Sequence, residues 1–110
     1  MAFDPQSIRQ QYEQLLKADL PFYLHPACRI DNLAALLCLN VTYTSRFVNE
    51  ELGMSFTQLL RNLRLDYAVR LRQEKPYMAL QDLAYAAGFN NETTFRRAYK
   101  ERYGCNPSEA

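Results

Sequence analysis

Apolar residues recur at helical spacing along most of this chain of 110 residues. Over residues 80–87 they stand at i, i+3, i+4 and i+7, which predicts a short helix with one small, apolar face. Gly88 follows and can take the positive φ of a helix C-cap. Asn90 is then placed to N-cap a second helix that runs to residue 103. Two helices joined by a short turn with a glycine predict a helix-turn-helix at 80–107.

The same pattern occurs once more, earlier in the chain, at an offset close to 50 residues. The apolar series of residues 30–37 repeats that of the later helix, and Asn40 stands where Asn90 stands, as the matching N-cap. An internal duplication is far more specific than a single copy. We therefore expect helix-turn-helix units at 30–53 and 80–107. Further correspondences are Cys38 with Gly88, Arg46 with Arg96 or Arg97, and Gly53 with Gly104.

Residues 55–74 predict one long helix that connects the two units and, as a stiff rod, fixes their separation. Ser55 can N-cap this helix, and Pro76 ensures that it has ended. A wide apolar stripe runs along it. The stripe comprises Phe56, Leu59, Leu60, Leu63, Tyr67, Ala68 and Leu71.

Residues 1–29 precede the first unit. A moderately amphipathic helix is expected over 7–18, with Asp4 as its N-cap and Pro5 at its first position. It is either a linker helix from an upstream domain or an N-terminal helix of the fold, and we favour the linker. Residues 20–29 contain two prolines and read as an extended connector. The predicted helix places Ile8, Tyr12, Leu15 and Leu16 on one side, and Phe22 and Tyr23 anchor the connector.

The composition bears on which classes of function are open to this chain. The apolar fraction of 48% suffices for a core, and no apolar run approaches the ~18 to 20 residues of a membrane span. The formal net charge is only +1, which is weak evidence against nucleic-acid binding. The three cysteines lack metal-ligand spacing, and His25 is expected to be structural. No nucleophile–base pair, carboxylate dyad or phosphate loop is present, so we do not expect an enzyme. We also expect no metal, because the cysteines lack ligand spacing, and no cofactor.

The later unit also carries a family resemblance. Its sequence fits LxxLAxxAGFxxxxxFxRxYKxxxGxxP, which resembles the signature of the AraC/XylS family of bacterial transcription regulators. RLxxAxxL at 64–71 resembles the connecting helix of that family, and SRxVN at 45–49 resembles a Bacteroides-like branch. The first unit departs from the pattern, since relatives usually carry Leu at Thr44, an aromatic at Val48 and Gly at Cys38. Relatives also usually run on beyond Pro107 by a Tyr-Arg and a few residues, so the end of this chain looks shortened or naturally short.

The resemblance implies an all-α fold with two helix-turn-helix subdomains joined by a long central helix, behind an N-terminal linker helix. Residues 1–29 would be the linker and connector, and 30–110 the DNA-binding domain. The implied partner is double-stranded DNA, with RNA polymerase as a second partner. An upstream sensor or effector domain is expected to be missing, this segment is expected to make no membrane contact, and the expected location is the cytoplasm. The alternative is a helical protein-interaction module that kept the fold and has little DNA affinity.

The second helix of each unit would enter a major groove with its first turns facing base edges. Arginine suits guanine, asparagine adenine, glutamate cytosine and the threonine methyl thymine. Candidate base-reading residues are Thr42, Ser45, Arg46 and Asn49 in the first unit, and Asn91, Glu92, Thr93, Arg96 and Arg97 in the second. The resemblance assigns this role to Thr42, Ser45, Arg46, Glu92, Thr93 and Arg97. Candidate phosphate contacts are Asn40 and Asn90 at helix N-termini, with Arg61 and Lys100.

Overall fold

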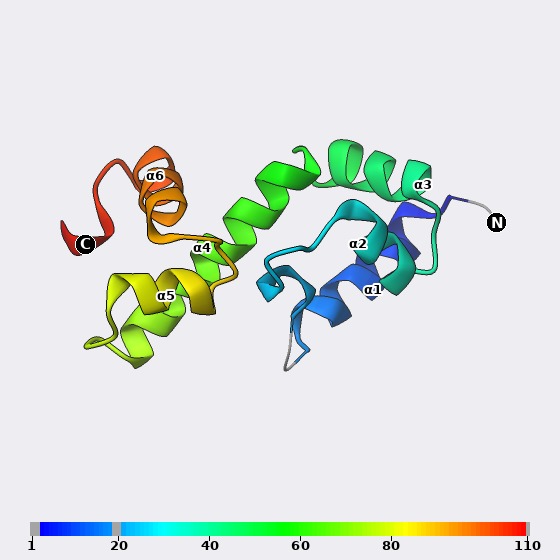
Figure 1. Ribbon diagram of the computed structural model, residues 1–110. Coiled ribbons are helices and arrows are strands. Elements are labelled where there is room, and N and C mark those ends of the chain that lie inside the picture. Colours follow the sequence, from blue (N-terminus) through cyan, green and yellow to red (C-terminus); the bar gives the residue numbers. More distant parts are fainter. Residues whose placement is uncertain (1–2, 19–20, 110) are drawn as a thin grey trace. The chain divides into compact units, whose positions relative to one another are not determined.

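The computed structural model describes residues 3–18 and 21–109, with only the backbone described at residue 109 (Figure 1). Within these residues the regular structure is entirely helical, which confirms the all-α prediction. The chain divides into two compact units, Met1–Leu59 and Leu60–Ala110. The elements in order are α1 (Pro5–Leu16), η1 (Phe22–Leu24), α2 (Ile30–Leu36), α3 (Val41–Arg46), η2 (Phe47–Glu51), α4 (Phe56–Glu74), α5 (Leu80–Ala86), α6 (Glu92–Tyr103) and η3 (Pro107–Glu109).

Helix α1 is an integral part of the first unit. Asp4 caps it by accepting a hydrogen bond from the Ser7 N–H at 3.4 Å, and Pro5 is its first residue, as predicted. Ile8 and Tyr12 are buried, and the Tyr12 ring lies 5.7 Å from the ring of Phe47. Burial raises the pKa of Tyr12 to about 12. Helix α1 is therefore packed against the first unit and is not loosely attached, and its expected role as a linker from an upstream domain stays a prediction. The boundary predicted between residues 29 and 30 stays a prediction.

The connector after α1 is less extended than predicted. Phe22–Leu24 forms a 3-10 turn, with Tyr23 buried and Phe22 half-buried, so Tyr23 provides the expected anchor. Leu20 lies outside the described residues. His25 accepts a hydrogen bond at Nδ1 from the Ala27 N–H at 3.1 Å, in agreement with a structural role.

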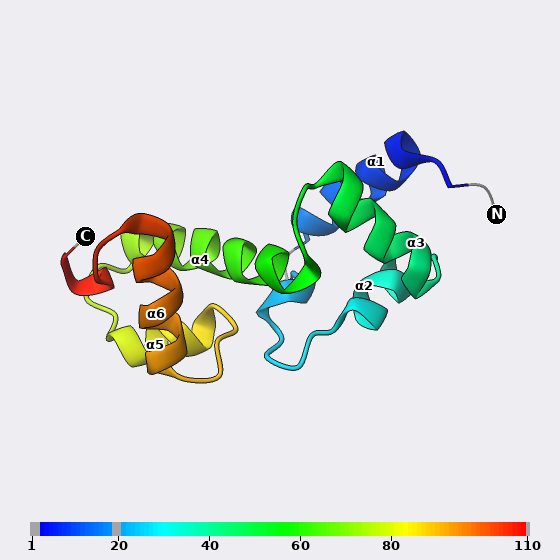
Figure 2. The same ribbon diagram turned by 90° about the horizontal axis from the view of Figure 1, so that it is seen from above.

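The first helix-turn-helix is formed by α2, α3 and η2, which lie against one another in Figures 1 and 2. Asn40 caps α3 as predicted, by accepting from the Tyr43 N–H at 2.7 Å. The turn before it places Cys38 at a φ of 56°, a left-handed conformation that favours glycine. A π-helical turn, η2, continues α3. No pattern in the sequence predicted this turn.

The departures from the family pattern leave the core of the first unit intact. Phe47 is fully buried, one position before the aromatic that relatives carry at residue 48. Val48 is also fully buried. Thr44 is the buried polar side chain among the described residues, and its hydroxyl donates to the Asn40 carbonyl at 2.9 Å. Because this hydroxyl has a partner, its burial carries no unpaired polar group.

Helix α4 confirms the predicted long helix. The Ser55 hydroxyl accepts from the Gln58 N–H at 3.2 Å, and the Gln58 side chain accepts in return from the Ser55 N–H at 3.1 Å. This reciprocal pair is a capping box. The predicted stripe omitted Leu65, which is fully buried in the core of the second unit beside Ala68 and Leu71.

The second helix-turn-helix differs from the prediction at one residue. Gly88 has a φ of 92°, as expected for the end of α5. The N-cap of α6 is Asn91, which accepts from the Thr94 N–H at 2.8 Å. The assignment of Asn90 as N-cap was therefore wrong, because this turn has one residue more than the first one.

That extra residue resolves the alignment of the two units. The capping residues Asn40 and Asn91 lie 51 positions apart, whereas Cys38 and Gly88 in the turns lie 50 apart. Arg46 therefore corresponds to Arg97 and not to Arg96. The buried positions follow the same offset, with Thr44 matching Phe95, Phe47 matching Ala98 and Val48 matching Tyr99.

The two turns predict opposite effects of matched substitutions. Gly88→Val should lower the free energy of unfolding by ~1 to 3 kcal/mol, because a β-branched side chain at positive φ is strained. Cys38→Gly should raise it by up to ~1 kcal/mol, because the relief of strain exceeds the extra unfolded-state entropy of glycine. Urea denaturation of both variants tests the pair. An unchanged stability in Gly88→Val would contradict the left-handed cap.

Candidate nucleic-acid interface

In the first unit the candidate residues lie on the outer face of α3 and η2. Thr42 and Asn49 are exposed, and Ser45 is half-buried. The Asn49 amide donates to the Ser45 hydroxyl at 3.2 Å, so these two candidates form one polar pair. Val41 is 45% exposed and adds an apolar group of the kind that contacts a thymine methyl. The four residues predicted in this unit therefore share one outward surface.

Arg46, the cation of this surface, is held from two sides. Its Nε donates to the Glu50 carboxylate at 3.0 Å. The ring of Phe3 lies 4.3 Å from its Cζ, in cation–π contact. The side chain nevertheless keeps 52% of its surface exposed. Arg46 is therefore accessible, but its orientation is already restricted.

In the second unit the candidates begin at the N-cap of α6. Glu92 and Arg96 are both half-buried and pair with each other at 2.8 Å, one helical turn apart. Thr93 and Arg97 are exposed. Within the described part of the chain, Arg97 forms no ion pair or ring contact. Arg97 is thus the less constrained of the two arginines, and Arg96 is engaged by its own helix.

The four candidate phosphate contacts have different surroundings. The Asn40 side chain is occupied as a helix cap. Asn90 is exposed, but it lies one residue before the cap of α6. Arg61 pairs with Glu101 at 2.9 Å, whereas Lys100 is exposed. Lys100 is therefore the candidate whose charge is most available to a phosphate.

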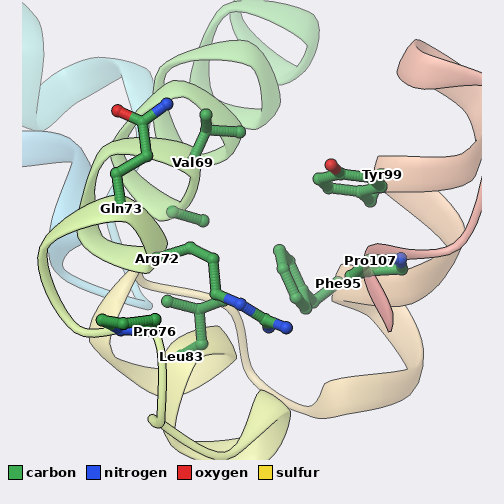
Figure 3. Close-up of a pocket in the computed structure, with 9 residues that line it drawn as sticks. Val69, Arg72, Gln73, Pro76, Leu83, Phe95, Tyr99 and Pro107 are labelled. Atoms are coloured by element: carbon green, nitrogen blue, oxygen red, sulfur yellow. The ribbon is translucent and has the colours of Figure 1, made fainter. Parts of the chain in front are cut away.

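A pocket of about 260 Å³ lies behind α6 in the second unit (Figure 3). Phe95 and Tyr99 of α6 form one wall, and Leu83 of α5 and Arg72 of α4 stand opposite them. Burial raises the pKa of the Tyr99 phenol, and the nearby Cys105 raises it further, while Arg72 opposes the change. Phe95 and Tyr99, the α6 side chains that pack into the core of the second unit, therefore border this pocket on one side.

Phe3 is the residue near this surface that sequence reasoning missed. It precedes the predicted first helix and belongs to no motif, so no sequence signal indicated its contact with Arg46. The contact arises because α1 packs against η2 and brings its N-terminal end beside α3 (Figures 1 and 2).

The described residues contain no group of three or more His, Cys, Asp and Glu side chains placed to hold a metal ion. Over the same part of the chain, no helix has the length and apolarity that a membrane span requires.

Comparison with known proteins gives the family. Residues 33–110 match the helix-turn-helix domain family. The chain is 31% identical over 75 residues to the HTH-type transcriptional regulator GlxA of Rhizobium meliloti (strain 1021). That match covers 68% of this chain and 23% of GlxA, so the chain spans less than a quarter of the regulator's length.

Solved structures share the fold. The C-terminal domain of AraT, a response regulator from Geobacillus stearothermophilus, superimposes with a TM-score of 0.77 at 23% identity, over 99% of this chain and 85% of that one. The DNA-binding domain of AdpA, a global transcriptional factor solved with a target DNA, gives 0.75 at 19% identity, over 94% and 87%. The Bacteroides-like branch stays a prediction. With the family match spanning most of its length, the chain belongs to the helix-turn-helix domains of AraC-type transcriptional regulators.

Proposed function

We propose that this chain binds double-stranded DNA at specific sequences, as the DNA-binding domain of a bacterial transcription regulator. The second helix of each unit, α3 with η2 and then α6, enters a major groove. Arg46 and Arg97 read base edges through paired N–H donors, for which guanine O6 and N7 are the matching acceptors. The remaining candidates contribute hydrogen bonds and methyl contacts beside them.

The observation that carries this proposal is the structural duplication. Two helix-turn-helix units, each within its own compact part of the chain, place an arginine at the same position after a capping asparagine. Both arginines are accessible, and their neighbours are the hydroxyl, amide and carboxylate groups that recognise bases. A helical hairpin that serves only to form a hydrophobic core does not require the same polar face to recur in both units.

The remaining roles belong to the same proposal. The chain acts in the cytoplasm and is not an enzyme, since its outward residues suit recognition rather than acid–base or nucleophilic chemistry. An upstream sensor or effector domain would control it, and RNA polymerase would be a second partner. The protein-interaction module remains the competing function.

In-vitro selection of the 110-residue chain against a random duplex library at moderate salt tests the proposal. We expect enrichment of two different short sequence elements, here called boxes, that lie about one helical turn, ~10 bp, apart. The reason is that each unit reads its own stretch of the major groove. The two boxes need not form a palindrome, because one chain supplies both units. A folded sample that enriches no sequence would support the interaction module instead.

A further inference from the structure

Phe3 and Arg46 form a contact that the proposed function does not yet use. The half-buried Phe3 ring lies 4.3 Å from Arg46 Cζ, and its centroid lies 5.6 Å from that of Tyr43. The Glu50 carboxylate binds Arg46 Nε at 3.0 Å. One guanidinium on the outer face of α3 is thus held by an aromatic ring and a carboxylate.

The geometry leaves the two terminal nitrogens of this guanidinium, Nη1 and Nη2, available for contacts with bases. Arg46 Cζ lies over the Phe3 ring, and this cation–π contact requires no hydrogen bond from the guanidinium N–H groups. The bond to Glu50 uses Nε. Within the described part of the chain, neither Nη1 nor Nη2 of Arg46 donates a hydrogen bond. Two adjacent donors therefore remain for the acceptor pair that guanine presents in the major groove.

We propose that Phe3 is a positioning residue for base reading, which fixes the orientation of Arg46 before DNA binds. This inference rests on the proposed function. A side chain held in its bound orientation loses less rotamer entropy on binding, so affinity and base discrimination both rise. Arg97 has no aromatic partner among the described residues and serves as the internal comparison.

The contact itself is tested in the chain without DNA. The Nε–H signals of Arg46 and Arg97 are followed by ¹⁵N-edited NMR in the wild type, Phe3→Ala and Phe3→Tyr. The ring current of Phe3 should shift the Arg46 signal in the wild type, Phe3→Ala should remove that shift, and Phe3→Tyr should retain it. The Arg97 signal should not respond. An Arg46 signal that is unchanged in Phe3→Ala would overturn the contact.

The positioning role is tested on the duplex that the wild type selects. Affinities are measured for this duplex and for versions with the base read by Arg46 or by Arg97 replaced. Phe3→Ala should lower discrimination at the Arg46 base by about 2- to 5-fold, the range expected for an exposed cation–π contact. Phe3→Tyr should restore it, and discrimination at the Arg97 base should stay constant.

The outcomes separate the two proposals. Equal or tighter selective binding by Phe3→Ala would mean that Phe3 does not position Arg46, or that it masks Arg46, and would overturn this inference alone. An equal loss at both bases would indicate a general structural effect and would also overturn it. A wild type that selects no sequence would overturn the proposed function, and the role of Phe3 with it.

Discussion

Replacing Arg46 and Arg97 together with alanine is expected to lower affinity for the selected duplex by a factor of at least about 30, since each bidentate arginine–guanine pair contributes ~1 to 3 kcal/mol. The two side chains occupy equivalent places in two separate units, so their losses should add. Fluorescence anisotropy with the selected and a scrambled duplex measures the effect. The loss should be much larger on the selected duplex than on the scrambled one.

Arg70→Ala with Lys75→Ala is the matched control. Both residues are exposed. Arg70 lies four residues before the end of α4 and Lys75 directly follows that helix, so both are away from the recognition helices in the sequence, and the variant loses the same charge. We expect a uniform loss of a few-fold on both duplexes, because phosphate attraction does not depend on sequence. Equal losses of selectivity in the two double variants would contradict base reading by Arg46 and Arg97.

Phe95→Ala is expected to have the largest effect on stability, a loss of ~3 to 5 kcal/mol. Phe95 is fully buried, and its ring centroid lies 5.3 Å from that of Phe89 and 6.0 Å from that of Tyr99. It also lines the pocket behind α6, so removing the ring joins a new cavity to existing space (Figure 3). Against a total of ~5 to 15 kcal/mol for a small domain, such a loss is severe.

Native-state hydrogen exchange of the α5 and α6 amides measures this loss where it occurs. Tyr77→Ala is the control, because it also removes an aromatic ring in the second unit but one that is 99% exposed. Its effect should lie within about 0.5 kcal/mol of zero. A loss below ~1 kcal/mol in Phe95→Ala would mean that α6 does not depend on this ring for its position.

Local chemistry explains why much of the fold could be predicted. The caps of α1, α3 and α4 use Asp4, Asn40 and Ser55, whose side chains bond N–H groups only three residues away. Such contacts are encoded locally in the sequence. Both Asn90 and Asn91 fit the N-cap pattern of α6. The length of the turn between α5 and α6 determines that Asn91 is the cap.

The site could be predicted as a set of positions but not as a set of contacts. Helical periodicity identifies the outward residues of α3 and α6. It does not show that Arg96 is paired with Glu92 or that Arg46 is paired with Glu50, because these residues have more than one possible partner. The cation–π contact between Phe3 and Arg46 depends on the packing of α1 against η2, which joins residues far apart in the chain.

The most direct test of the central claim, that each unit reads its own box, is to repeat the in-vitro selection with the single variants Arg46→Ala and Arg97→Ala. Each variant should lose base preference in one box only, and the two variants should affect different boxes. Loss of the same box in both variants, or full retention of both boxes in each, would contradict the assignment of one box to each unit.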